Sequence, residues 1–158
     1  MVSRVPKVFR IVAIVAALLI VGSGLALPWA FYWRELKNVD GRPAAPASAR
    51  SPEEVNAIWA EHEPHLTQEK LSDISPYWFY FFLGCATELY SCSVKQNMSE
   101  MAGFVALTYL RDGHFTRKSG LHWHTTGMCL TIWIQRTMTA SDLANAYVEA
   151  KSLYRPKN

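Results

Sequence analysis

Several patterns that mark common classes of protein are missing from this sequence of 158 residues. It contains no Cys-x-x-Cys pair, which argues against a thiol oxidoreductase. No run alternates between apolar and polar residues, so nothing indicates a β-sheet and the expected fold class is all-α. The net charge of +3 comes largely from the N-terminal end, and the remainder is near neutral. That balance argues against a nucleic-acid-binding surface.

Charge is also missing from the twenty-three residues Ile11–Trp33. At about 1.5 Å per residue, a helix of this length crosses the ~30 Å hydrocarbon core of a membrane. Residues 1–10 are expected in the cytoplasm by the positive-inside rule, because three of them are basic: Arg4, Lys7 and Arg10. The far end carries aromatic residues typical of the opposite interface: Trp29, Phe31, Tyr32 and Trp33. We therefore expect a single-pass protein of the bacterial inner membrane, with its C-terminal domain in the periplasm.

A cleaved secretory signal peptide is the alternative, because Gly24-Leu25-Ala26 has the small-x-small pattern of a cleavage site. The apolar run continues well past Ala26, however, whereas the apolar region of a signal peptide has only about 7–15 residues. An uncleaved anchor over residues 11–33 is therefore favoured. In either case the C-terminal part is exported.

A linker is expected between the anchor and the domain. We assign residues 34–50 to it, because Gly41–Ser51 is rich in proline, alanine and serine and has little to bury. Residues 51–158 then form one helical domain with a modest core.

Helix-start signals divide this domain into five expected helices. Ser51-Pro52 joins an N-cap hydroxyl to a first-turn proline, and Pro64 ends that helix. An apolar run after Ser75-Pro76 is typical of a buried central helix. The other three are expected from near Asn97 or Ser99 to Gly113, from about Trp123 to Met138, and after the capping box Thr139–Asp142.

Three cysteines, Cys85, Cys92 and Cys129, would lie in an oxidising compartment. One disulfide and one free thiol is the simplest arrangement. Cys85 and Cys92 are too far apart to be bridged within a regular helix, so a bridge from Cys129 to one of them is expected. Three buried, unpaired thiols are the alternative.

Two sets of residues are candidates for chemistry. Glu88 is a lone carboxylate in an apolar helix, where desolvation would raise its pKa as suits a general acid or base; exposure or pairing with Lys95 is the alternative. Ser99 lies at a helix N-terminus near the basic loop of Arg117 and Lys118, and such a place can bind a phosphate or sugar pyrophosphate. An N-cap and a solvated loop explain the same three residues without a ligand.

The histidines do not predict a metal site. His122 and His124 form a His-x-His pair that points apart on a helix, and Pro64 breaks the helix between His62 and His65. Neither pair is completed by a further ligand at a recognisable spacing. We therefore expect no metal and no cofactor.

Three segments resemble motifs of the peptidoglycan glycosyltransferases, or transglycosylases. Cys129–Tyr147 is similar to a late motif of that family, and Ser99–Leu110 is similar to its S-T-I-T-Q-Q-L-x-K-N-L-F-L helix. Ile74-Ser-Pro-Tyr and Ala86-Thr-Glu88 are similar to the lead-in and first glutamate of its A-x-E-D-x-x-F motif. The resemblance covers about Ser72–Tyr154 and implies a lysozyme-like fold.

Many motif residues of that family are replaced in this chain. Leu89 stands at the aspartate of the catalytic motif, Gly103 and Phe104 at the two glutamines, and Ala140 at a lysine. The resemblance implies that Glu88 would be the base. It also implies that Arg117 and Lys118 would supply charge for the pyrophosphate.

These observations predict a short, degenerate relative of the glycosyltransferases. It would bind a peptidoglycan-related glycan, a lipid-linked precursor or an envelope protein. One alternative is an active minimal glycosyltransferase that uses Glu88 as acid and base. The other is a structural subunit of a membrane assembly, so enzymatic activity is left open.

Overall fold

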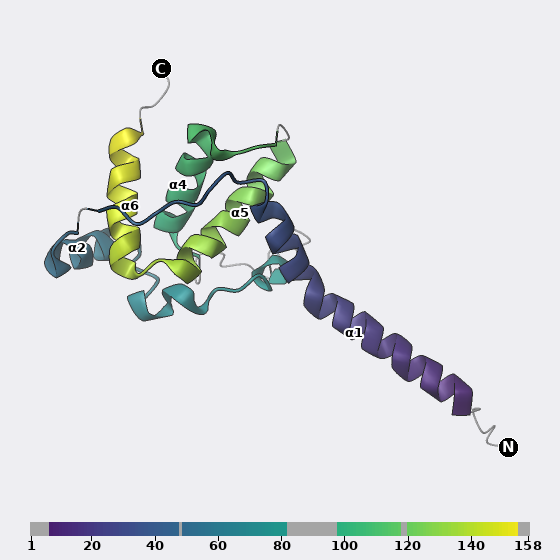
Figure 1. Cartoon of the computed structure of the whole chain (residues 1–158). Helices are drawn as coiled ribbons and strands as arrows, with labels where there is room; N and C mark the ends of the chain where they lie inside the picture. The colour runs from purple at the N-terminus through teal and green to yellow at the C-terminus, as the bar shows by residue number, and fades with distance from the viewer. Residues whose placement is uncertain (1–6, 48, 82–97, 118–119, 155–158) are drawn as a thin grey trace.

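The computed structural model describes residues 7–47, 49–81, 98–117 and 120–154. Within these ranges the chain is helical and has no strand, as predicted; Val39 and Phe115 form one isolated antiparallel bridge. The described residues form five α-helices, a 3-10 helix η1 and a π-helical turn η3 (Figure 1). Their bounds are α1 Lys7–Leu36, α2 Pro52–His62, η1 Gln68–Asp73, α4 Glu100–Tyr109, η3 Leu110–His114, α5 Gly120–Thr137 and α6 Ala140–Leu153.

Helix α1 projects from the bundle that the other helices form (Figure 1). Within the described ranges, Val12–Leu36 is the one stretch long and apolar enough to cross a membrane. Its apolar side chains are largely exposed, for example Leu18 at 66% and Leu19 at 68%. An apolar surface of this extent needs an environment other than water. The structure therefore agrees with a membrane-spanning or signal-like helix at this place.

The C-terminal turns of α1 belong to the domain. Tyr32, Glu35 and Leu36 are at most 2% exposed, and α1 packs against α5. The three positions follow helical spacing, so they form one buried stripe on α1. The apolar helix and the core of the domain are thus parts of one continuous element.

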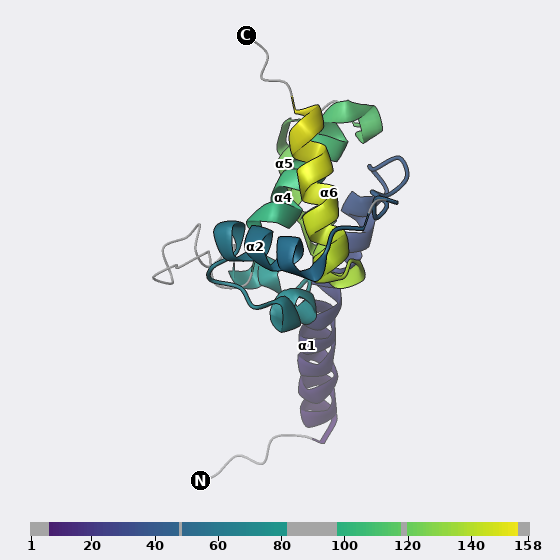
Figure 2. The ribbon, with the colours of Figure 1, turned by 90° about the vertical axis from the view of Figure 1, so that its left-hand side faces the viewer.

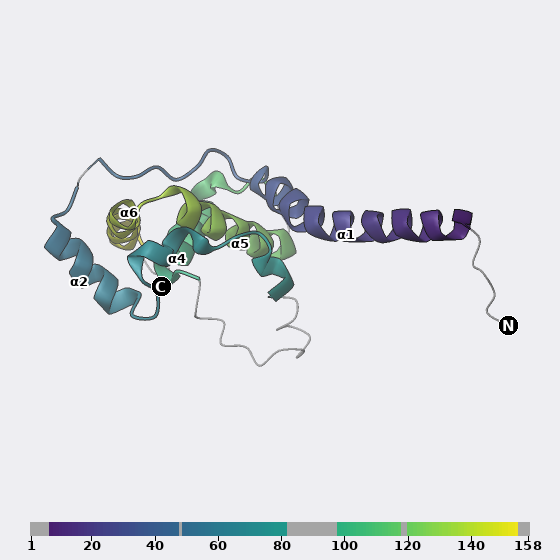
Figure 3. The same cartoon turned by 90° about the horizontal axis from the view of Figure 1, so that it is seen from below.

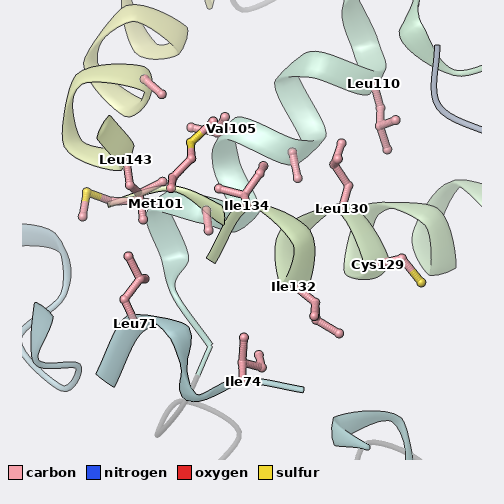
Figure 4. Packing of buried hydrophobic residues seen from close by; sticks show 14 of the residues in the cluster. Leu71, Ile74, Met101, Val105, Leu110, Cys129, Leu130, Ile132, Ile134 and Leu143 are labelled. Atoms are coloured by element: carbon pink, nitrogen blue, oxygen red, sulfur yellow. The ribbon is translucent and has the colours of Figure 1, made fainter. Parts of the chain in front are cut away.

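The hydrophobic core lies where α4 packs on α5 and on α6 (Figure 4). Side chains from all three helices gather there, and the following are fully buried: Met101, Leu130, Ile132, Ile134 and Leu143. Leu71 of η1 and Ile74 after it cover α5 from another side (Figure 4). Helix α2 packs on α6 (Figure 2).

Local signals predicted the helix ends well. Ser51 and Thr139 open α2 and α6 with complete capping boxes, and Ser99 caps α4. Gly113, at φ +102°, lies in the left-handed region where a glycine was expected to stop the helix. Helix α5 begins at Gly120, a few residues earlier than predicted.

The expected linker, residues 34–50, is not a free spacer. Its first residues complete α1, and residues 37–47 run along the domain toward α2 at the far end (Figure 3). Val39 is only 6% exposed, and the guanidinium of Arg42 donates to the Leu36 carbonyl at 3.1 Å and lies over Trp133. Residues near the end of α1 therefore hold the start of this segment against the domain.

Other expectations fall on residues 82–97, which are outside the described ranges. They concern most of the central helix predicted after Ser75-Pro76, with Cys85, Glu88 and Cys92. The lysozyme-like arrangement of the helices also stays a prediction.

Candidate functional site

Ser99 lies at the N-terminus of α4, as predicted, but its hydroxyl is enclosed. The residue is 2% exposed; its Oγ accepts the Ala102 amide at 3.0 Å and donates to Oε1 of Glu63 at 2.5 Å. The same Glu63 oxygen accepts the Met101 amide at 2.8 Å. Ser99 is thus an N-cap, the alternative to a phosphate site, and a carboxylate of the chain itself occupies this helix N-terminus.

Glu63 is the C-cap of α2 and is 1% exposed. Burial raises the pKa of its carboxyl, although the hydrogen bond from Ser99 acts in the opposite direction. Its Oε2 lies 3.7 Å from Nε2 of His65, and both atoms are buried without a hydrogen bond. Gln135 of α5 closes the cluster, since it accepts the Ser99 amide at 3.1 Å and donates to the Leu71 carbonyl at 3.3 Å.

The structure does not bring Ser99 and Arg117 together. Ser99 contacts Gln135 near the C-terminal end of α5, whereas Arg117 donates from Nη1 to Nε2 of His122 at 2.9 Å in the first turn of the same helix. Thirteen positions separate His122 from Gln135, which is about 20 Å along a helix. Lys118 lies outside the described ranges. Ser99 and Arg117 therefore do not form one anion site.

A second buried carboxylate, Glu35, joins α1 to α5 and was missed by the sequence analysis. It is 1% exposed, and its Oε2 accepts the hydroxyls of Thr125 and Thr126 at 3.0 and 2.9 Å. Both of its oxygens lie 3.2 Å from Nδ1 of His122, and Asn38 donates to Oε2 at 3.3 Å. The one signal in the sequence is that Glu35 is the first acidic residue of the chain, two positions after the uncharged run.

Both ring nitrogens of His122 are engaged in this cluster. Nδ1 faces the Glu35 carboxylate, an acceptor, while Nε2 faces the guanidinium of Arg117, a donor. A carboxylate behind an imidazole can orient a general base. Here Arg117 Nη1 also contacts the ring, and the cluster holds α1 to α5.

A row of side chains with tilted or edge-to-face rings crosses α2, α6 and α4. Tyr147 lies 4.8 Å from His62 and 5.4 Å from Phe104 between ring centroids, and Phe104 lies 5.7 Å from Tyr154. The guanidinium of Arg111 lies 4.8 Å over the Tyr154 ring. We call these five residues the aromatic ridge. A shallow hollow of about 150 Å³ is lined by three of them together with Glu100 and Met101.

The remaining predicted residues are only partly described. Cys129 is a fully buried free thiol, and burial raises its pKa. Cys85, Cys92 and Glu88 lie outside the described ranges. The bridge expected from Cys129 to Cys85 or Cys92 is absent, since Cys129, a described residue, is free. The catalytic role of Glu88 stays a prediction.

Within the described part of the chain, no group of three or more His, Cys, Asp or Glu side chains could hold a metal ion. Comparison of the chain with protein-family models, with curated proteins and with solved structures gives no match. The features that bear on function are therefore the Glu63 cluster, the Glu35 cluster and the aromatic ridge.

Proposed function

We propose that this protein is a single-pass membrane protein whose helical domain binds a protein partner at the membrane surface and does not catalyse a reaction. Its place would be the bacterial inner membrane with the domain in the periplasm. The basic residues before the apolar helix support this orientation: Arg4, Lys7 and Arg10.

One observation carries the proposal. Helix α1 runs without interruption from its exposed apolar part into the core, where Tyr32, Glu35 and Leu36 are buried. A domain joined to its anchor in this way has a fixed height and orientation relative to the membrane. Such rigidity suits a subunit that presents a surface to a neighbour, whereas an enzyme that searches for a substrate gains nothing obvious from it.

The state of the polar groups also supports binding over catalysis. Ser99 donates a hydrogen bond to Glu63, and both residues are buried. Glu35 accepts hydrogen bonds from two threonine hydroxyls of α5. A catalytic group needs access to a substrate atom. In the described residues, none of these three groups has that access.

The aromatic ridge supplies a surface for the partner. Tyrosine and arginine are enriched among the residues that carry binding energy at protein interfaces. Tyr154 is 40% exposed, and Arg111, which lies over its ring, is exposed as well. The rings hold one another in place, so little side-chain freedom would be lost when a partner binds.

The test is photocrosslinking in native membranes from cells that make the full chain. A benzophenone amino acid replaces Tyr154, and the matched control carries it at Glu53, which is exposed on α2. We expect a discrete protein adduct from position 154 and none from position 53. Adding Arg111→Ala should reduce the yield. Equal labelling from both positions, or no adduct, would argue against a partner at the ridge.

A lipid-linked glycan precursor is the second candidate ligand, and the resemblance of Ser72–Tyr154 to peptidoglycan glycosyltransferases favours it. We would measure lipid II polymerisation by the detergent-purified protein beside a Glu88→Gln variant. Neither should form glycan chains under conditions in which a transglycosylase is active. Chains from the wild type but not from the variant would establish a minimal enzyme and contradict the non-catalytic role.

A further inference from the structure

Helix α1 contains a proline, and the carbonyl group that this proline leaves without its helical donor has another partner. Pro28 has no amide hydrogen, so it cannot donate to the carbonyl of Gly24 four residues earlier. The hydroxyl of Tyr80 donates to that carbonyl instead. Tyr77 donates to the next carbonyl, that of Leu25, at 3.1 Å. Two tyrosines more than fifty positions away in the sequence thus bind α1 at the place where Pro28 removes a helical hydrogen bond.

The segment Pro76–Phe81 therefore lies beside the apolar part of α1. Phe79 packs edge-to-face against Phe31 at 4.9 Å between ring centroids, and is itself 9% exposed. The other aromatic side chains that face outward are exposed by 39 to 53%: Trp33, Tyr77, Tyr80 and Phe81. We call these four residues the aromatic collar.

The length of α1 sets the height of the collar. Only Ile11–Leu27, about 17 residues, precedes the point at which the domain begins to cover the helix, since Pro28 is buried. At 1.5 Å per residue this stretch is about 26 Å long, less than the ~30 Å of a hydrocarbon core. Tyr77 donates to Leu25 and Tyr80 donates to Gly24, both within that stretch. The collar is therefore level with the edge of the bilayer wherever α1 spans it.

The chemistry of these side chains suits that depth. Tyrosine and tryptophan prefer the membrane interface. The hydroxyls of Tyr77 and Tyr80 donate to carbonyls of α1, so neither of these donors would be left unpaired among acyl chains. Arg136 lies close by, with its guanidinium 5.4 Å over the Trp29 ring, and could reach headgroup phosphates.

We propose that the aromatic collar is a lipid-binding surface that enters the interfacial layer of the bilayer and seats the domain on the membrane. The proposal rests on the membrane-spanning role of α1 given above. Lipid is the expected occupant because the collar is continuous with the exposed apolar surface of α1. The collar also lies at the same height as the end of that apolar surface.

The test uses the full chain in liposomes of phosphatidylethanolamine and phosphatidylglycerol, with a benzophenone amino acid at one position. Phe81 and Trp33 probe the collar, Leu18 probes the span, and Leu153, exposed at the end of α6, is the distant control. Lipid adducts are counted by mass spectrometry after irradiation. We expect adducts from positions 18, 81 and 33 in comparable yield and none from 153.

The outcomes separate the two proposals. Adducts from position 18 but not from 81 would overturn the collar and leave the anchor intact. No adduct from position 18 would overturn the membrane span and the collar with it. Adducts from 153 as strong as those from 81 would also overturn the collar, because the contact would then be nonspecific.

A second measurement tests the contact between Tyr80 and Gly24 without a bulky probe. Tyr80→Phe should lower the Tm of the protein in nanodiscs when Pro28 is present. In a Pro28→Ala background, residue 28 can donate to Gly24 itself, so Tyr80→Phe should have a much smaller effect. An equal loss in both backgrounds would contradict the role assigned to the Tyr80 hydroxyl.

Discussion

Glu63 and Glu35 are carboxylates removed from water, and donors from other elements compensate each of them. Glu63 accepts the Ser99 hydroxyl and the Met101 amide at the N-terminus of α4, while Glu35 accepts two threonine hydroxyls of α5. Burial of a charge without such partners is costly. Each carboxylate therefore fixes two helices in one relative position, and each makes a testable contribution to stability.

Glu63 should make stability depend on pH. Its pKa is raised in the folded protein, so the folded state keeps the proton to a higher pH than the unfolded chain does. This contribution is fully present below the ordinary value of about 4.5 and is lost as the pH rises through the folded pKa. We expect Glu63→Gln to flatten the fall of Tm with pH in this range, measured by thermal unfolding in detergent. Exposed Glu53→Gln is the control; equal slopes for Glu63→Gln and the wild type would contradict the assignment.

Loss of the Glu35 carboxylate should destabilise the junction between α1 and the domain. Glu35→Ala leaves Asn38, Thr126 and His122 without their shared acceptor, at a cost of about 2–4 kcal/mol. Glu149→Ala, at an exposed position of α6, should change stability by less than about 0.5 kcal/mol. Denaturant unfolding in a mild detergent measures both. Similar values for the two variants would show that the cluster does not hold the junction.

At the scale of elements, the sequence predicted features made by neighbouring residues but not contacts between residues far apart in the chain. Ser51, Ser99 and Thr139 marked three helix starts correctly, because a cap is made by neighbours in the chain. Glu35 and its partners in α5 are 87 to 91 positions apart, and no spacing in the sequence connects them. The packing of residues 37–47 on the domain was missed for the same reason.

Gly41, in the turn after α1, and Gly103, inside α4, should respond to substitution by alanine with opposite changes in stability. Gly41 has φ +71°, and a Cβ there would lie 2.9 Å from the Tyr109 hydroxyl, so Gly41→Ala should cost at least about 1–2 kcal/mol. Gly103 lies inside α4 with open space around it, so Gly103→Ala should stabilise by about 0.5–1 kcal/mol. Unfolding of both variants under one condition gives the comparison. A stabilising Gly41→Ala would contradict the turn geometry after α1.

At the scale of the whole molecule, composition was enough to predict an all-α protein with an N-terminal apolar helix. It was not enough to predict how the two parts are joined. The aromatic residues of 29–33 suited a membrane interface, but Tyr32 is 2% exposed because it packs inside the domain. An apolar run shows that a surface avoids water, and only the folded chain shows whether lipid or protein covers it.

The central claim is that anchor and domain form one rigid unit, and a distance distribution between them tests it most directly. Spin labels on noncanonical amino acids at Val21 and Glu149 leave the native cysteines unchanged, and pulsed electron paramagnetic resonance is measured in nanodiscs. A short Gly-Ser insertion between Leu27 and Pro28 is the flexible control. We predict one narrow distribution for the native sequence and a broad one for the control. A distribution for the native sequence as broad as that of the control would contradict the claim.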